Sequence, residues 1–190
     1  IGGGVAGLNA AVIAMGMGAD VTVLDRSLAR LAYIDTIYQG RIKTLASTFG
    51  AIDREVKSAD LVIGAVLVHG AKAPKLVTNE QVKGMKPGAV LVDIAIDQGG
   101  CFEDSRATTH AEPTFKVHEA IFYCVANMPG AVPVASTYAL TNATLPYALS
   151  LANNGWEAAI AKDSALAKGL NVHAGKVCYE AVAVAHGYSM

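Results

Sequence analysis

The sequence is poor in cysteine and has no long uncharged apolar run. Its three cysteines, Cys101, Cys124 and Cys178, are far apart and form no Cys-x-x-Cys pair. We therefore expect neither a disulfide-stabilised scaffold nor a zinc ribbon, and we expect a reducing, cytoplasmic setting. No apolar run approaches the roughly 18 uncharged residues of a membrane span, so no membrane-spanning segment is expected.

Charged residues are scarce and balanced in sign. The 190 residues include 15 Lys and Arg against 16 Asp and Glu, which gives a formal net charge of −1. A broad nucleic-acid surface needs clustered positive charge, so we expect no nucleic-acid partner. Hydrophobic residues make up 53% of the chain, enough apolar surface to offset the entropy lost when the chain folds.

The first 130 residues alternate short β-branched runs with amphipathic stretches. We expect strands at residues 20–25, 41–46, 61–67, 89–96 and 120–125, and helices at 7–17, 28–38, 52–58 and 79–85. Continuous apolar strands with helices between them are typical of a parallel sheet that is buried on both faces. The sequence therefore predicts an α/β fold with a Rossmann-type, doubly wound parallel sheet.

The character of the sequence changes after Pro133. Helices are expected at residues 136–151, 156–162, 164–168 and 177–185. Pro146 predicts a kink or a restart, with Thr144 as a possible cap of the restarted helix. We place a domain boundary here: residues 1–133 form the sheet domain, and residues 134–190 form helices that pack on it, on a further part of the protein or on another subunit.

A glycine motif opens the sequence. Gly2, Gly4 and Gly7 have the spacing Gly-x-Gly-x-x-Gly directly before the first expected helix. In such a loop the first glycine permits a tight turn, the second lets the backbone approach a pyrophosphate, and the third lets the helix lie close to the sheet. A glycine-rich turn without a ligand is the alternative. Because no Met precedes Ile1, we expect a segment before it and interpret Ile1 as the last residue of a strand.

An acidic residue follows the motif at the expected place. Asp25 ends the next strand, 18 residues after Gly7, where a ribose-binding acid belongs. A carboxylate that accepts a hydrogen bond from the ribose 2′-hydroxyl favours NAD, because the 2′-phosphate of NADP would meet like charge. Arg26 is expected to be a solvated charge, although it could also turn toward a 2′-phosphate.

Two further strand ends carry polar side chains. Asp97 follows the strand at 89–96, and we expect it to be functional because ligands bind at the carboxyl ends of strands in open α/β sheets. An acid that only shapes a turn is the alternative.

Asp93, inside the apolar run, is expected to be a structural hydrogen-bonding acid, and Cys101 is expected to be an inert packing residue. In the loop after the strand at 61–67, His69 is expected to be a solvated histidine rather than a proton carrier.

The remaining basic and titratable residues are expected to have no chemical role. Lys72 and Lys75 lie in the same loop as His69 and are expected to be solvated. His110 and His118 have no third ligand at a suitable spacing, so no metal site is expected.

Longer strings of residues resemble one known family, the NAD-dependent L-alanine dehydrogenases. The strings are DLVIGAVLV at 60–68, GAKAPKL at 70–76, MKPG at 85–88, VDIAIDQGGCFE at 92–103, YCVANMPG at 123–130 and ALTNATLPY at 139–147. The resemblance covers essentially the whole sequence. The NAD-binding subunit of proton-translocating transhydrogenases is similar in part and is the near alternative.

The resemblance implies an oxidoreductase with two domains, assembled as a homohexamer. It would convert L-alanine, water and NAD reversibly into pyruvate, ammonium and NADH. Residues 134–190 would then return to the substrate domain. Asp97 would face the substrate and assist catalysis. By motif match, the cofactor-contacting positions are Gly2, Gly4, Ala6, Gly7, Asp25, Ser47, Val66, Leu67, Leu76, Ile94, Asp97, Asn127 and Met128, with Asn127 and Met128 near the nicotinamide.

The sequence departs from the family pattern in two respects. His69 stands where the family usually has Pro, which affects the loop rather than the chemistry. The family's catalytic His and substrate-binding Arg and Lys belong to an N-terminal part that these 190 residues do not include. The chain alone is therefore expected to bind NAD at most and not to turn over alanine, and a non-catalytic NAD(H)-binding module remains an alternative.

Overall fold

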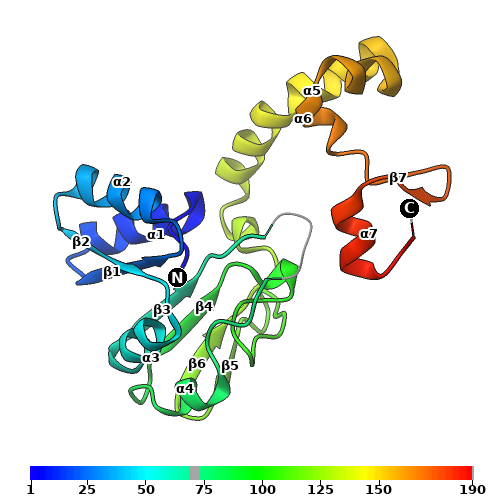
Figure 1. The fold of residues 1–190 in the computed structure, drawn as a ribbon. Coiled ribbons are helices and arrows are strands. Elements are labelled where there is room, and N and C mark those ends of the chain that lie inside the picture. The colour runs from blue at the N-terminus through cyan, green and yellow to red at the C-terminus, as the bar shows by residue number, and fades with distance from the viewer. Residues whose placement is uncertain (69–72, 190) are drawn as a thin grey trace. The chain divides into compact units, whose positions relative to one another are not determined.

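The computed structural model describes residues 1–68 and 73–189 (Figure 1). The predicted loop residues His69 and Lys72 lie outside this range. The described residues form two compact units, which we call the sheet unit (residues 1–68 and 73–126) and the helical unit (residues 127–189). The predicted domain boundary at Pro133 stays a prediction.

The strands of the sheet unit are parallel except for one at the edge. They are β1 (Val21–Asp25), β2 (Ile42–Ala46), β3 (Leu61–Gly64), β4 (Val90–Asp93), β5 (Thr114–Val117) and β6 (Ala120–Tyr123). Strand β1 pairs in parallel with β2, and β4 pairs in parallel with both β3 and β6. Strand β5 is an edge strand, antiparallel to β6, that the sequence did not predict.

Two residues at the start of the chain join these strands into one sheet. The Gly2 amide donates to the Leu24 carbonyl of β1 at 2.8 Å, and the Ile1 nitrogen donates to the Ile63 carbonyl of β3 at 2.7 Å. The Ala65 amide donates back to the Ile1 carbonyl at 2.9 Å. The order is therefore β2–β1–(Ile1–Gly2)–β3–β4–β6–β5, with Ile1 in the place predicted for the end of a strand.

Helices connect the strands. They are α1 (Val5–Gly16), α2 (Leu28–Tyr38), α3 (Phe49–Ser58) and α4 (Asn79–Lys83), and the short 3₁₀ helix η1 spans Ile96–Gln98. A hydroxyl side chain caps three of them: Ser27 for α2, as predicted, Thr48 for α3 and Thr78 for α4. Such caps satisfy amides that have no partner within the helix.

Helices cover both faces of the sheet. Successive residues of a strand point to opposite faces. Val23 of β1 packs in a cluster with Ala11 of α1 and Ile34 of α2, whereas its neighbour Leu24 packs in a second cluster with Ile52 of α3. The predicted doubly wound α/β fold is therefore confirmed.

Two strands end three residues earlier than predicted. The expected strands at 61–67 and 89–96 stop at Gly64 and Asp93. A Cβ atom on Gly64 would lie 2.2 Å from the Cys101 sulfur, so the chain after β4 folds back tightly onto β3. The Asp93 carboxylate holds this return through backbone amides, among them that of Ala95. These contacts come from the tertiary fold and leave no periodic signal in the sequence.

The helical unit contains a long helix and a small hairpin. Its elements are η2 (Met128–Ala131), α5 (Pro133–Lys162), α6 (Ser164–Ala167), β7 (Val172–His173), β8 (Lys176–Val177) and α7 (Glu180–His186). The predicted restart at Pro146 is wrong. The Thr144 hydroxyl donates to the Leu140 carbonyl one turn back, and the interruption falls at Gly155, whose φ of 73° favours glycine. The hairpin was not predicted. Within the described ranges no helix is long and apolar enough to cross a membrane.

Candidate functional site

The glycine loop is packed tightly at two of its three motif positions. A Cβ atom on Gly2, which has a φ of 96°, would lie 2.7 Å from the Ala65 carbonyl oxygen, and one on Gly7 would lie 1.9 Å from the Gly2 carbonyl oxygen. Gly4 differs, because nothing lies within 4 Å of its missing Cβ. A side chain is therefore excluded at Gly2 and Gly7 by the protein itself, while the space at Gly4 is open to a ligand.

The amino-terminal end of α1 faces this open space. Gly4 caps the helix without a side chain, and Gly4, Val5 and Ala6 are exposed. The first amides of a helix have no partner within it and carry the positive end of its dipole. Exposed amides beside an unfilled glycine are the arrangement that receives an anionic phosphate.

Asp25 lies beside this loop. Its Oδ2 accepts a hydrogen bond from the Gly3 amide at 2.7 Å, and its Oδ1 accepts one from the Ser27 amide at 2.8 Å. Each carboxylate oxygen has a second lone pair for another donor. The Ser47 amide donates to the Asp25 carbonyl at 2.9 Å. The structure thus brings Asp25 to the glycine loop and Ser47 to the backbone of Asp25, whereas Arg26 is exposed.

Arg30 is a site residue that the sequence analysis missed. Its Nε donates to the Gly3 carbonyl, and its guanidinium lies 4.9 Å from the centre of the Tyr33 ring. The Gly3 peptide is therefore held by Asp25 on one side and by Arg30 on the other. The position of Arg30 in the first turn of α2 was the available signal, since helical side chains lean toward the amino-terminal end.

The remaining predicted positions in the sheet unit follow the carboxyl ends of β3 and β4. Val66 lies next to the glycine loop, and Leu67 is exposed. The Ile94 amide donates to the Gly64 carbonyl at 2.8 Å. Leu76 is half-buried, and its amide donates to the Cys101 carbonyl at 2.7 Å; Asp97 is exposed on η1. These positions share one edge of the sheet with the glycine loop, because the strands that carry them are parallel.

Two predicted positions belong to the helical unit. Asn127 caps η2, and its side-chain oxygen accepts a hydrogen bond from the Gly130 amide at 3.2 Å. Met128 is the first residue of η2. Their predicted place near a nicotinamide stays a prediction.

Asp93 has the structural role that the sequence predicts. It is fully buried, and its carboxylate accepts hydrogen bonds from the amides of Ala95 at 3.0 Å and Cys101 at 2.8 Å, as well as from the Ser105 hydroxyl. Burial, together with the nearby Asp93 charge, raises the pKa of the Cys101 thiol to about 12. Cys101 therefore stays protonated near neutral pH, as expected of an inert packing residue.

Lys75 is exposed, as the prediction of a solvated lysine requires. Its ammonium group also donates to the carbonyls of Gly99 at 2.6 Å and Phe102 at 3.0 Å, two hydrogen bonds that the sequence did not predict. His118 contacts the Asn79 side-chain oxygen at 2.9 Å. In the part of the chain that the structure describes, no group of three His, Cys, Asp or Glu side chains could hold a metal ion.

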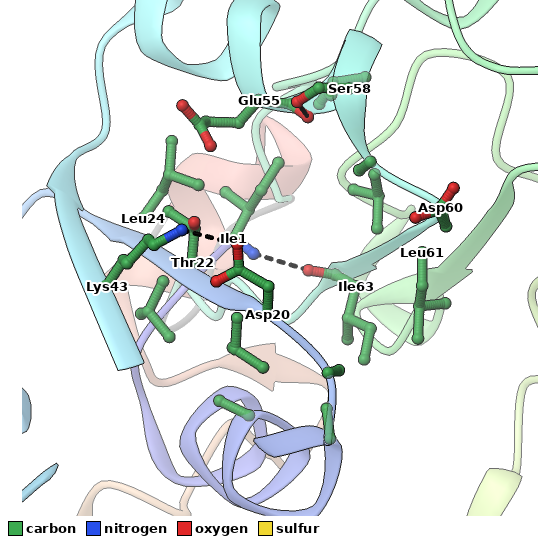
Figure 2. Close-up of a pocket in the computed structure, with 18 of the residues that line it drawn as sticks. Ile1, Asp20, Thr22, Leu24, Lys43, Glu55, Ser58, Asp60, Leu61 and Ile63 are labelled. Atoms are coloured by element: carbon green, nitrogen blue, oxygen red, sulfur yellow. Dashed lines mark hydrogen bonds and ion pairs between the residues drawn. The ribbon is translucent and has the colours of Figure 1, made fainter. Parts of the chain in front are cut away.

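A cavity of about 860 Å³ lies between β1 and β3 (Figure 2). It is lined by backbone and side chains of both strands and by residues of α1 and α3, which cover opposite faces of the sheet. Ile1 enters this space, with its nitrogen directed at the Ile63 carbonyl.

Comparisons with known proteins identify relatives. The family described as Alanine dehydrogenase/PNT, C-terminal domain, matches residues 1–180. The alanine dehydrogenase of Mycolicibacterium smegmatis is 68% identical over 183 residues, which are 96% of this chain and 49% of that protein. The alanine dehydrogenase of Halomonas elongata is 61% identical over 187 residues, which are 98% of this chain and 50% of that protein.

Solved structures agree with this result. An L-alanine dehydrogenase superimposes with a TM-score of 0.86 at 47% identity, over 98% of this chain and 51% of that one. A transhydrogenase from Sinorhizobium meliloti is a weaker match, with a TM-score of 0.65 at 28% identity, over 72% of this chain and 40% of that one. The chain spans about half the length of the curated relatives it matches. It belongs to the Alanine dehydrogenase/PNT C-terminal domain family.

Proposed function

We propose that this chain is the dinucleotide-binding part of an NAD-dependent L-alanine dehydrogenase. The whole protein would be a cytoplasmic homohexamer that converts L-alanine, water and NAD reversibly into pyruvate, ammonium and NADH. The observation that carries the proposal is the 68% identity to an alanine dehydrogenase, combined with a glycine loop whose one open position faces a helix start beside Asp25.

The residues of the sheet unit fit NAD as the cofactor. The exposed amides at the start of α1 would bind the pyrophosphate, with Gly4 leaving room for it. The Asp25 carboxylate would accept hydrogen bonds from the adenosine ribose, while Ser47 lies alongside. The other positions proposed to contact the cofactor are Gly2, Ala6, Gly7, Val66, Leu67, Leu76, Ile94, Asp97, Asn127 and Met128. When bound, NAD accepts a hydride at C4 of its nicotinamide ring.

Asp97 is proposed as the catalytic residue of this chain. Its carboxylate is exposed at the carboxyl-terminal edge of the sheet, so a small substrate could reach it. Oxidation of an amino acid at its α-carbon builds positive charge on the amino nitrogen. A fixed negative charge beside that nitrogen stabilises the charge as it develops, and the carboxylate can also orient the attacking water.

An activity measurement on the whole protein tests the proposal. NADH absorbance should rise when the protein is mixed with NAD and L-alanine. Asp97→Asn should lower kcat by about 100-fold or more, as expected when an electrostatic contact to the transition state is lost, while the Kd for NADH stays within about threefold. Asp53→Asn, at a half-buried acid on α3 that is paired with Lys57, is the matched control and should leave kcat unchanged. Unchanged turnover in Asp97→Asn would exclude the catalytic role.

The structural match to a transhydrogenase supports a second candidate, an NAD(H)-binding transhydrogenase subunit. The same assay separates the two. A protein that transfers hydride between two dinucleotides but forms no NADH from L-alanine would be the second candidate. A protein that binds NADH and catalyses neither reaction would be a non-catalytic binding module.

A further inference from the structure

We infer that Lys75 is a positioning residue whose ammonium group holds the turn that carries Asp97. The inference rests on the proposed function, since it concerns how the Asp97 carboxylate is kept in place.

Lys75 contacts this turn through two backbone carbonyl groups. Lys75 Nζ donates to the Gly99 oxygen at 2.6 Å and to the Phe102 oxygen at 3.0 Å. An ammonium group has three donors, so two of them are used here. Hydrogen bonds from a charged donor are roughly twice as strong as those between neutral groups. The two bonds close the turn from outside, on both sides of Gly100.

The backbone of the turn has little intrinsic rigidity. Gly99 and Gly100 have φ values of 90° and 75°, in the left-handed region that glycine adopts readily. Asp97 itself is exposed on a three-residue 3₁₀ helix, Ile96–Gln98. The direction of the Asp97 carboxylate therefore depends on how firmly neighbouring segments hold the backbone around it.

Two sets of contacts hold this backbone from opposite sides. On the inside, the buried Asp93 carboxylate accepts from the amides of Ala95 and Cys101, which flank the turn. On the outside, residues 73–77 run beside it: the Ala73 amide donates to the Gln98 carbonyl at 3.0 Å, and the Leu76 amide donates to the Cys101 carbonyl at 2.7 Å. Lys75 adds the only charged contact among the outside ones that the described residues make.

Accurate placement of Asp97 matters because misplacing a catalytic group by about 1 Å can cost on the order of 100-fold in rate. Lys75 bonds to backbone carbonyls, so its effect on the substrate would pass through Asp97. This separates it from the residues proposed to touch the cofactor. Loss of Lys75 should therefore lower turnover far more than it weakens dinucleotide binding.

The test uses the whole protein with Lys75→Met, Lys75→Arg and the control Lys83→Met, an exposed lysine on α4. Lys75→Met should lower kcat between about tenfold and 100-fold, with the KM for L-alanine and the Kd for NADH each within about threefold of wild type. Lys75→Arg should restore most of kcat, because a guanidinium can donate to both carbonyls. Unchanged kcat in Lys75→Met, in a wild type that oxidises alanine, would overturn the inference.

Two further measurements separate positioning from general destabilisation. In the Asp97→Asn background, Lys75→Met should have little additional effect on kcat; an undiminished loss there would show that Lys75 does not act through Asp97. Amide hydrogen exchange at residues 96–102 should be faster in Lys75→Met and normal in Lys83→Met, and equal exchange would overturn the proposed hold. A wild type without alanine turnover would refute the proposed function instead, and the exchange result would still decide whether Lys75 holds the turn.

Discussion

The carboxylate of Asp25 has one structural role and one proposed binding role. Its two oxygens accept hydrogen bonds from the Gly3 and Ser27 amides, so it fixes the glycine loop to the start of α2. It also presents its remaining lone pairs beside that loop, where the proposed ribose lies. In the proposed function, a single side chain would connect the shape of the loop with the choice between NAD and NADP.

Replacing Asp25 should change cofactor selectivity. Asp25→Ala removes a hydrogen bond to a charged acceptor, worth about 1.5–3 kcal/mol, so the Kd for NAD should rise between about tenfold and 100-fold. NADP should bind better relative to NAD, because the like charge at its 2′-phosphate is gone. Titrations with both dinucleotides measure this, with Arg26→Ala as an exposed control expected within about twofold of wild type. An equal Kd for NAD in wild type and Asp25→Ala would refute the ribose role.

Individual side chains differ in how far the sequence predicts their roles. Asp93 was assigned correctly, because an acid inside an apolar run must be hydrogen-bonded to be buried. The hydrogen bonds of Arg30 and Lys75 were not predicted, because each side chain bonds to the backbone of a distant glycine segment. Their partners depend on how the chain folds back, and a basic residue has the same local pattern whether it is solvated or bonded.

At the scale of elements, different glycines at the start of α1 serve packing and the proposed binding of a ligand. Gly7 sits where a Cβ would overlap the Gly2 carbonyl, while Gly4 faces open space with a φ of −66°, which any residue can adopt. One glycine is therefore needed to dock the helix, and the other is needed only if a ligand approaches the backbone. This difference allows the two roles to be tested separately.

Alanine substitutions should divide accordingly. Gly7→Ala should lower the free energy of unfolding by at least about 1–3 kcal/mol through overpacking. Gly4→Ala should leave the free energy of unfolding within about 0.5 kcal/mol of wild type, as for an unconstrained surface site. The same change should weaken NADH binding at least about tenfold, because the added methyl group fills the proposed pyrophosphate space. Urea unfolding and NADH titration measure the two effects. Gly16→Ala, at an open position on the same helix, is the control. Normal NADH binding by Gly4→Ala would contradict the phosphate site.

The order and type of the main elements were predictable, and several of their ends were not. Alternating apolar runs and amphipathic stretches predicted every parallel strand of the sheet unit, because their period is local. The ends of β3 and β4 are determined instead by the close approach at Gly64 and the hydrogen bonds of Asp93. In the helical unit, α5 is interrupted at Gly155 and not, as the sequence had suggested, at Pro146. Pro146 lies inside the helix, whereas a residue with a φ of 73°, such as Gly155, cannot continue a helix.

At the scale of the whole molecule, large apolar side chains of the helical unit are exposed. Large side chains of α5 are exposed, including Tyr138, Leu140 and Leu145. Exposed apolar side chains gathered on one element are typical of an interface, and the chain spans about half the length of the curated relatives it matches.

We therefore expect the 190-residue chain to bind NADH but not to catalyse the oxidation of L-alanine. The glycine loop, Asp25 and Ser47 all lie within it, so it should bind NADH, with an affinity up to about tenfold below that of the whole protein if the cavity loosens β1 against β3. It should form no NADH from NAD and L-alanine, because the resemblance assigns the substrate-binding residues to the other half. Fluorescence titration and an absorbance assay on both proteins, prepared side by side, measure this. Turnover of L-alanine by the 190 residues alone would show that Asp97 and its neighbours suffice for the chemistry, and failure of the whole protein to bind NADH would remove the proposed site altogether.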